Sequence, residues 1–174
     1  MDVVKGPDNI RDQWFTELVE EYQDILLRTC CVILKDYALA EDAVQDTFLK
    51  VYQASDTFRK ECSEKTWLMK IAMNTCRDIK RRAWFRWNDR RVTPDQLPEA
   101  FSMLEFKDDE LMQNILSLPY KAREVLLLYY YQDMTLQEIG QSLNLAVSTV
   151  HTRLAQAKKK LRAAMEGGDD RARS

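Results

Sequence analysis

Residues 135–161 carry polar and basic side chains at spacings that suit contact with DNA. Thr135 and Glu138 fit a capping box at the start of a short helix, and Asn144 can end that helix in the left-handed conformation. A longer helix is expected from about residue 147 to 165. The short turn between these two helices is typical of a helix-turn-helix.

The second of these helices separates apolar from polar side chains. Hydroxyl and amide groups near its start can reach base edges, and three consecutive lysines farther along suit the DNA backbone. The alternative is an ordinary helical hairpin with a solvated basic face. The stripe expected to pack inward consists of Val150, Leu154, Ala157 and Leu161. The side chains expected to face outward are Ser148, Thr149, Thr152, Arg153, Gln156, Lys159 and Lys160.

A second group of charged residues lies in the segment 40–52. Asp42 and Asp46 are one helical turn apart and therefore share a face. Three interpretations stay open from the residues alone. With Glu41 they could bind a metal, they could dock a basic partner, or they could form a solvated face, which is the simplest of the three.

A third group combines cations with aromatic rings. Phe58, Arg59 and Lys60 lie in a polar stretch that precedes a helix expected from about Glu64 to Ala83. Aromatic and cationic side chains together suit stacking on unpaired bases and neutralisation of a single strand. Trp67 falls on the apolar stripe of that helix and is expected in the core. The outer face carries Lys70, Asn74, Arg77, Asp78, Arg81 and Arg82.

Helical periodicity runs through almost the whole chain and predicts an all-α protein. Further helices are expected over about 14–34 and 39–54, and again from Leu111, with Gly167 and Gly168 ending the last one. Residues 84–108 lack periodicity and contain two prolines, which predicts a flexible linker between two small helical domains. No strand pattern is present in the sequence.

The charge alternates along the chain although the net charge is only −2. Residues 53–91 hold 11 Lys and Arg against 5 Asp and Glu, and residues 148–174 hold 7 against 3. Residues 1–52 are acidic, with 5 Lys and Arg against 11 Asp and Glu. Two basic segments separated by acidic ones predict two separate contacts with a polyanion, and the overall acidity predicts weak non-specific binding.

Composition excludes several classes of function. A single histidine rules out a histidine-built metal centre, and four glycines leave no phosphate-binding fingerprint. Four cysteines without a Cys-x-x-Cys pair predict reduced, partly buried thiols rather than a zinc or disulfide site. The longest apolar run, Val125–Tyr131, is far shorter than the ~18 residues that span a membrane. No signal segment is visible in the sequence. A cytoplasmic protein is therefore expected.

Taken in order, these segments resemble the extracytoplasmic-function (ECF) sigma factors of the sigma-70 family. An Ala-Glu-Asp-x-Val-Gln-Asp-x-Phe-x-x-Val-Tyr helix at 40–52 is followed by Phe58. Then comes Thr-Trp-Leu-x-x-Ile-Ala-x-Asn-x-x-x-Asp-x-x-Arg-Arg at 66–82. Leu118-Pro119 and the helix-turn-helix complete the order. The resemblance covers about residues 10–165.

The resemblance implies an alternative sigma factor that binds core RNA polymerase, directs it to promoters and helps melt the −10 region. A sigma-2-like domain is implied at 10–83, a linker at 84–108, and a sigma-4-like helix-turn-helix domain at 109–165. The partners implied are the polymerase β′ and β subunits, promoter DNA and an anti-sigma factor. No enzymatic activity, catalytic residue, cofactor, metal or membrane insertion is expected.

The resemblance also assigns roles to residues. Docking on core polymerase is implied for Asp42, Gln45, Asp46, Phe48 and Leu49. Contact with the −10 DNA is implied for Phe58, Arg59, Lys60, Asn74, Arg77, Asp78, Arg81 and Arg82, with Asn74 and Asp78 at a flipped-base pocket. Contact with the −35 DNA, through the helix-turn-helix Leu136 to Ala155, is implied for Ser148, Thr149, His151, Thr152, Arg153, Gln156, Lys159 and Lys160.

Two other functions compete with this interpretation. The first is a helix-turn-helix transcription regulator whose helical N-terminal half senses a ligand or protein. The second is a helical metalloenzyme built on Glu41, Asp42 and Asp46, which lacks a second carboxylate motif or a histidine to complete its site.

Overall fold

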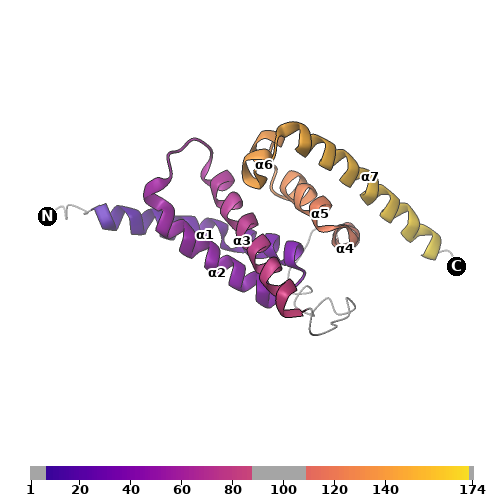
Figure 1. The fold of residues 1–174 in the computed structure, drawn as a ribbon, viewed down its shortest axis with the longest axis horizontal. Coiled ribbons are helices and arrows are strands. Elements are labelled where there is room, and N and C mark those ends of the chain that lie inside the picture. Colours follow the sequence, from indigo (N-terminus) through magenta and orange to yellow (C-terminus); the bar gives the residue numbers. More distant parts are fainter. Residues whose placement is uncertain (1–6, 88–108, 173–174) are drawn as a thin grey trace.

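The computed structural model describes residues 7–87 and 109–172, and in these ranges the regular structure is entirely helical (Figure 1). The N-terminal half, residues 7–87, consists of α1 (Pro7–Leu34), α2 (Tyr37–Ala54), the short 3₁₀ turn η1 (Ser55–Thr57) and α3 (Glu64–Trp87). The C-terminal half, residues 109–172, consists of α4 (Asp109–Ser117), α5 (Tyr120–Leu126), the π-helical turn η3 (Leu127–Tyr131), α6 (Leu136–Leu143) and α7 (Val147–Ala172).

The N-terminal half is a three-helix bundle in which α2 returns along α1 and α3 packs against both. Lys35 takes a left-handed conformation in the tight turn after α1. Asp36 then caps α2, because its side chain accepts a hydrogen bond from the Leu39 amide at 2.9 Å. The largest side chains fully buried in this bundle are Leu26, Val32, Ile33, Val51, Leu68, Met69 and Met73.

The C-terminal half is built around its helix-turn-helix. The capping box is confirmed, because the Glu138 amide donates to Thr135 Oγ1 at 3.3 Å and the Thr135 amide donates to Glu138 Oε2 at 2.8 Å. Asn144 is left-handed, with φ 55° and ψ 51°, as predicted. Val150, Leu154 and Ala157 are buried, so the predicted inward stripe of α7 is confirmed for these three residues.

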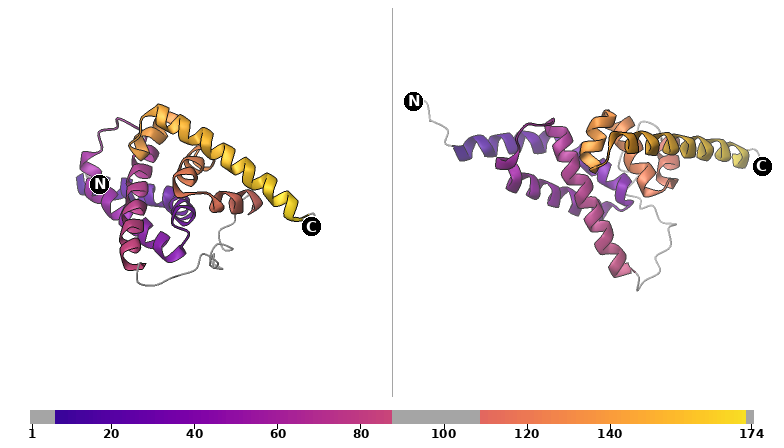
Figure 2. Two further views of the ribbon diagram at one scale, coloured as in Figure 1. Left: turned by 45° about the vertical axis from the view of Figure 1, so that its right-hand side comes forward. Right: turned by 45° about the horizontal axis from the view of Figure 1, so that its top comes forward.

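The two halves lie against each other rather than apart (Figure 2). The most extensive contact between them joins α3 and α6, and a smaller one joins α1 and α5. Helix α3, whose outer face is predicted to contact the −10 DNA, therefore also contacts the C-terminal half.

Several element boundaries differ from the sequence prediction. Helix α1 begins at Pro7 rather than near Trp14, and α3 continues to Trp87, four residues into the expected linker. The remaining linker residues, 88–108, lie outside the described residues. Helix α7 continues through Gly167 and Gly168 to Ala172. Glycine in a helix costs about 1 kcal/mol relative to alanine but permits helical dihedral angles, so two glycines without a following proline do not stop the helix.

The capping box generates a stability prediction. Replacing Thr135 by alanine removes the side-chain acceptor of the Glu138 amide and should lower the free energy of unfolding by about 1 kcal/mol. Urea denaturation followed by circular dichroism measures this loss. Thr16→Ala is the control, because the Thr16 hydroxyl lies exposed within α1 and bonds only the Asp12 carbonyl there. Equal losses in the two variants would contradict the importance of the cap.

Candidate nucleic-acid interface

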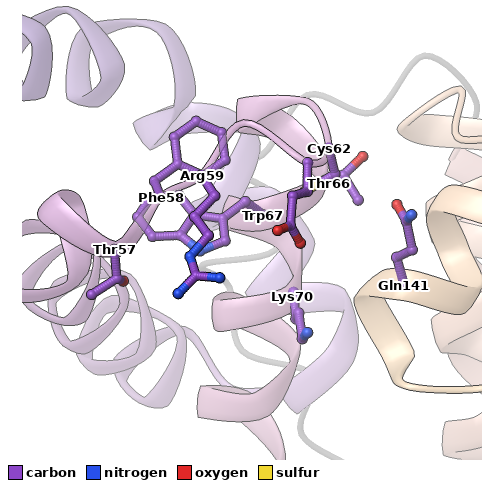
Figure 3. Close-up of a pocket in the computed structure, with 9 residues that line it drawn as sticks. Thr57, Phe58, Arg59, Cys62, Thr66, Trp67, Lys70 and Gln141 are labelled. Atoms are coloured by element: carbon purple, nitrogen blue, oxygen red, sulfur yellow. The ribbon is translucent and has the colours of Figure 1, made fainter.

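A pocket of about 280 Å³ lies where the loop after η1 meets the start of α3 (Figure 3). Two of the residues predicted to contact unpaired bases, Phe58 and Arg59, line it. The third, Lys60, is exposed in the same loop with φ 56°, outside the pocket lining. The lining consists of Thr57, Phe58, Arg59, Glu61, Cys62, Thr66, Trp67, Lys70 and Gln141.

Two stacked aromatic rings form one wall of this pocket. The rings of Phe58 and Trp67 lie 4.7 Å apart at an interplanar angle of 25°. Trp67 also approaches Trp14, at 6.4 Å, and Trp14 is fixed because its indole nitrogen donates to Glu64 Oε1 at 2.8 Å. Trp67 is therefore packed against the core on one side, as predicted, and faces the pocket as well.

The pocket combines this aromatic wall with two exposed cations, Arg59 and Lys70. Such a site can hold a planar ring by stacking while neutralising nearby phosphates. Gln141 comes from α6 of the other half and lies on the side of the pocket opposite Thr57 and Phe58. Sequence reasoning missed Gln141, because only the contact between distant helices brings it to this loop.

The outer face of α3 continues beyond the pocket, and its polar side chains are paired with one another. Arg77 Nη1 donates to Asn74 Oδ1 at 3.0 Å, and Arg81 Nη2 donates to Asp78 Oδ1 at 3.1 Å. Arg82 Nε donates to the Asp78 carbonyl at 3.4 Å. Asn74 and Asp78 do not line the pocket that Phe58 and Arg59 form. They follow it along the same helix.

Helix α7 presents its polar face away from the buried stripe. Of the side chains predicted to contact the −35 DNA, Thr149 and Arg153 are half-buried. Arg153 Nη1 lies 3.9 Å from Glu124 Oε2. The Thr152 hydroxyl bonds the Ser148 carbonyl within the helix at 3.0 Å. The remaining ones are exposed: Ser148, His151, Thr152, Gln156, Lys159 and Lys160.

The acidic face of α2 lies on the surface of the N-terminal half. Asp42 and Gln45 are exposed, Asp46 is half-buried, and Leu49 has 56% of its surface exposed, which is unusual for a leucine. Phe48 is buried and packs edge-on against Phe15 at 6.2 Å, so it supports α2 from behind. Within the described residues, no cluster of three His, Cys, Asp or Glu side chains could hold a metal ion.

Two adjacent charged residues, Arg123 and Glu124, are buried between the halves. Arg123 donates to the carbonyls of Leu116, Leu118 and Ile33, at 3.2, 2.9 and 3.0 Å. Burial lowers the pKa of Arg123 to about 10, which leaves it charged at neutral pH.

The Glu124 carboxylate is paired with two arginines, and Arg77 donates a hydrogen bond to it. Its Oε1 lies 3.4 Å from Arg77 Nη2, and Arg153 approaches its Oε2. Burial raises the pKa of Glu124, while Arg77 and Arg153 oppose that shift. Sequence reasoning missed this pair. Its one signal was two opposite charges directly before the longest apolar run of the chain.

The cysteines are free thiols, as predicted. Cys30 and Cys76 approach to 3.5 Å between their sulfur atoms in the core, and burial raises the pKa of Cys31 to about 12. Cys30, Cys31 and Cys76 are buried, so no reactant can reach their sulfur atoms from solvent. Within the described ranges, no helix has the length and apolar character to cross a membrane.

Both halves of the chain match models of known protein regions. Residues 18–86 match Sigma-70 region 2, and residues 108–161 match Sigma-70, region 4. The chain is 32% identical over 163 residues to the ECF RNA polymerase sigma factor SigW of Bacillus subtilis (strain 168), covering 85% of this chain and 87% of that protein. It is 32% identical over 171 residues to the RNA polymerase sigma factor YlaC of the same organism, covering 91% and 93%.

Solved structures share the fold. CnrH in complex with the cytosolic domain of CnrY has a TM-score of 0.68 and 25% identity, covering 90% of each chain. The sigma factor RpoE in complex with the anti-sigma factor NepR from Bartonella quintana has a TM-score of 0.71, covering 87% of this chain and 96% of that one. At 19% identity this second likeness concerns the fold alone.

The turn of the helix-turn-helix generates a second stability prediction. A Cβ atom at Gly140 would lie 2.8 Å from the Leu145 carbonyl oxygen, which is backbone and cannot move without shifting the turn. Gly140→Ala should therefore lower the melting temperature and displace α7 relative to α6. Thermal denaturation measures the first effect, and amide chemical shifts at the start of α7 measure the second. Gln137→Ala, an exposed change in the same helix, should do neither. An unchanged melting temperature in Gly140→Ala would refute the close approach.

Proposed function

The chain belongs to the ECF sigma factors of the sigma-70 family, and we propose that it divides the work of a sigma factor among three surfaces. An alternative sigma factor binds core RNA polymerase, directs it to specific promoters and helps to melt the −10 region. The proposed surfaces are the acidic face of α2 for polymerase, the pocket and outer face of α3 for the −10 strand, and the polar face of α7 for the −35 duplex.

The observation that carries this proposal is the pocket beside α3. Stacked aromatic rings with Arg59 and Lys70 nearby suit a base that has left the double helix. We propose that one base of the melted −10 strand enters here. Asn74 and Arg77 would then receive the strand that leaves the pocket, and Asp78, Arg81 and Arg82 would follow it farther along α3. A duplex-reading regulator has no use for such a pocket.

The −35 contact is proposed for the exposed polar face of α7. Gln156 is exposed, and Arg153 lies half-buried one turn earlier on the same side of the helix, where side chains can reach base edges in the major groove. Ser148, Thr149, His151 and Thr152 lie at the helix start, where base contacts are concentrated in helix-turn-helix proteins. Lys159 and Lys160 would contact the DNA backbone.

Docking on core polymerase is proposed for α2. Asp42, Gln45 and Asp46 offer an acidic and polar surface to a basic partner, and the exposed Leu49 adds an apolar contact at the end of it. Phe48 would act indirectly, by holding α2 against Phe15. The β′ subunit is the proposed partner on this face, with further contact to β.

The proposal also includes two domains, at 10–83 and 109–165, a lack of enzymatic activity and a cytoplasmic location. An anti-sigma partner is proposed because the sigma factor RpoE from Bartonella quintana, whose fold this chain shares, forms a complex with the anti-sigma factor NepR. The alternative of a helix-turn-helix regulator with a sensor half is set aside, because the family match extends over both halves. The metalloenzyme is set aside for the same reason.

The docking surface is tested by charge reversal. Asp42→Arg with Asp46→Arg should abolish binding to core polymerase, because like charges would then face each other at the contact. Affinity is measured by titration of labelled protein with core enzyme, and helicity by circular dichroism. The matched control is Glu17→Arg with Glu21→Arg, two exposed acidic residues one turn apart on α1. Unchanged core affinity in the α2 variant would refute this surface.

The two DNA surfaces are separated by their effects on two steps of initiation. Arg153→Ala should weaken closed complexes. It should also lower the discrimination between bases at one −35 position by about 1–3 kcal/mol. Arg59→Ala and Asn74→Ala should leave closed complexes nearly normal and impair strand opening. A template with a pre-melted −10 bubble should rescue them, since flipping a base costs a few kcal/mol that the bubble removes.

Permanganate footprinting and transcription on intact and bubble templates measure these steps, using a promoter that the holoenzyme transcribes. If variants in both halves impair the same step by similar amounts, the assignment of separate steps to α3 and α7 is wrong.

A further inference from the structure

The start of α1 contacts both ends of the loop that carries Phe58. This loop, residues 55–63, consists of η1 and the residues that lead into α3. Arg11 and Trp14 lie three positions apart in α1 and therefore share one face of the helix. Arg11 contacts the start of the loop, and Trp14 contacts the residue that follows its end. Both precede the segment 18–86 that matches Sigma-70 region 2, so that match does not account for either contact.

At the start of the loop, Arg11 binds the end of α2. Its Nη2 donates to the Tyr52 carbonyl at 2.8 Å, and its Nη1 lies 3.4 Å from Asp56 Oδ2. The guanidinium carbon lies 4.3 Å from the centroid of the Tyr52 ring, and the Tyr52 hydroxyl donates to Asp12 Oδ1 at 3.0 Å. A cation at the last carbonyls of a helix is favourable, so Arg11 fixes the point at which the chain leaves α2.

At the end of the loop, Trp14 holds the start of α3. Its indole nitrogen donates to Glu64 Oε1 at 2.8 Å, and its ring centroid lies 6.4 Å from that of Trp67. Trp67 stacks in turn on Phe58, whose ring belongs to the pocket wall (Figure 3). Three aromatic rings therefore form a row from α1 to the pocket, and the bond to Glu64 fixes the inner end of this row.

Between these two contacts, the loop is held by short-range bonds. The Phe58 amide donates to the Ser55 carbonyl at 3.2 Å, and the Thr57 hydroxyl donates to the Ala54 carbonyl at 2.7 Å. Lys60 has φ 56°, a left-handed conformation that is unfavourable for residues other than glycine. Because each ordered residue costs conformational entropy, contacts at both ends of the loop reduce the number of conformations open to the Phe58 ring.

We propose that Arg11 and Trp14 are positioning residues that clamp the loop 55–63 between them. The clamp (Arg11 and Trp14) keeps Phe58 stacked on Trp67 before the −10 strand arrives. It acts through the loop and does not itself contact DNA. Holding a binding loop in its bound form raises affinity, because less order has to be created when the ligand binds. The inference rests on the proposed function only in that Phe58 receives a base.

The first test removes the indole hydrogen bond and keeps an aromatic ring. Trp14→Phe lacks the donor to Glu64 but can still pack on Trp67. Hydrogen exchange of the free full-length chain, measured by mass spectrometry, should show faster deuterium uptake in the loop 55–63 and unchanged uptake in the middle of α2. Loop uptake equal to that of the unsubstituted chain would overturn the clamp.

Two changes at Glu64 separate its hydrogen bond from its charge. Glu64→Leu removes the acceptor and should speed loop exchange as Trp14→Phe does, and the double variant should be no faster than either single one, because all three lack the same bond. Glu64→Gln keeps an oxygen that accepts from Trp14 and should leave the loop protected. Exchange in Glu64→Gln as fast as in Glu64→Leu would show that the charge matters instead, and would overturn the Trp14 contact.

The other end of the loop is tested at Arg11. Arg11→Met removes the guanidinium but keeps an unbranched side chain, and it should also speed exchange in the loop 55–63. The matched control is Arg28→Met, which removes a cation from an exposed site on the same helix and should leave the loop unchanged. Equal loop uptake in these two variants would overturn the role of Arg11. Because the variants at Arg11, Trp14 and Glu64 are independent, the failure of one to fold leaves the others decisive.

The effect on base capture is measured with the holoenzyme. The probe is a fluorescent single-stranded oligonucleotide that carries the −10 sequence of a promoter that the holoenzyme transcribes. If Trp14→Phe keeps the loop in its binding conformation in about a tenth of the molecules, affinity for the oligonucleotide should fall about tenfold, because only that fraction binds. Affinity for core polymerase should stay constant, which a general loss of structure would not allow.

Phe58→Ala distinguishes failure of the clamp from failure of the pocket assignment. If Phe58→Ala weakens oligonucleotide binding while Trp14→Phe and Arg11→Met loosen the loop without any loss of affinity, the clamp is overturned and the pocket stands. If neither Phe58→Ala nor the loosened variants lose affinity, the clamp still holds the loop, and the assignment of the pocket to the −10 strand is wrong. Loss of affinity in all three variants supports both proposals.

Discussion

The arrangement of the two halves depends on how two buried charges on α5 are satisfied. Arg123 reaches carbonyl groups at the ends of α4 and α1, so one guanidinium joins elements of both halves. Glu124 is the next residue and is equally buried, but its partners are arginines whose positions depend on the other helices. Since buried charges are costly without partners, these two residues define one relative placement of α1, α3 and α7.

Features that depend on local sequence could be predicted. The Thr135–Glu138 capping box, the left-handed Asn144 and the buried stripe at Val150 follow from residue types a few positions apart, and all three are confirmed. The family itself followed from the order of such local motifs along the chain. Local signals failed at helix ends, where α3 runs on to Trp87 and α7 passes through its glycines, because end positions depend on small differences in free energy.

The candidate sites were only partly predictable, because they combine residues that are far apart in the sequence. Helical periodicity placed Trp67 in the core, yet its stacking with Phe58 also makes it a pocket wall. Gln141 reaches the same pocket from 71 positions beyond Lys70, through the contact of α6 with α3. Phe48 differs in the opposite direction, because the sequence predicts it at a binding surface and the structure buries it. The family resemblance assigns it to the docking surface, but it is buried against Phe15, where it supports α2 from behind.

The different surroundings of Arg123 and Glu124 explain how one interface can be both specific and reversible. Arg123 makes three hydrogen bonds to backbone carbonyls, two of them within its own half, so it keeps most of its partners when the halves separate. Among the interactions of the described residues, the Glu124 carboxylate accepts no hydrogen bond from a backbone amide, and both its arginine partners lie on surfaces proposed to bind DNA. Separation therefore costs Arg123 one bond and gives Glu124 access to water. The same helix turn can thus hold α5 in place within its half while leaving the contact with Arg77 free to exchange.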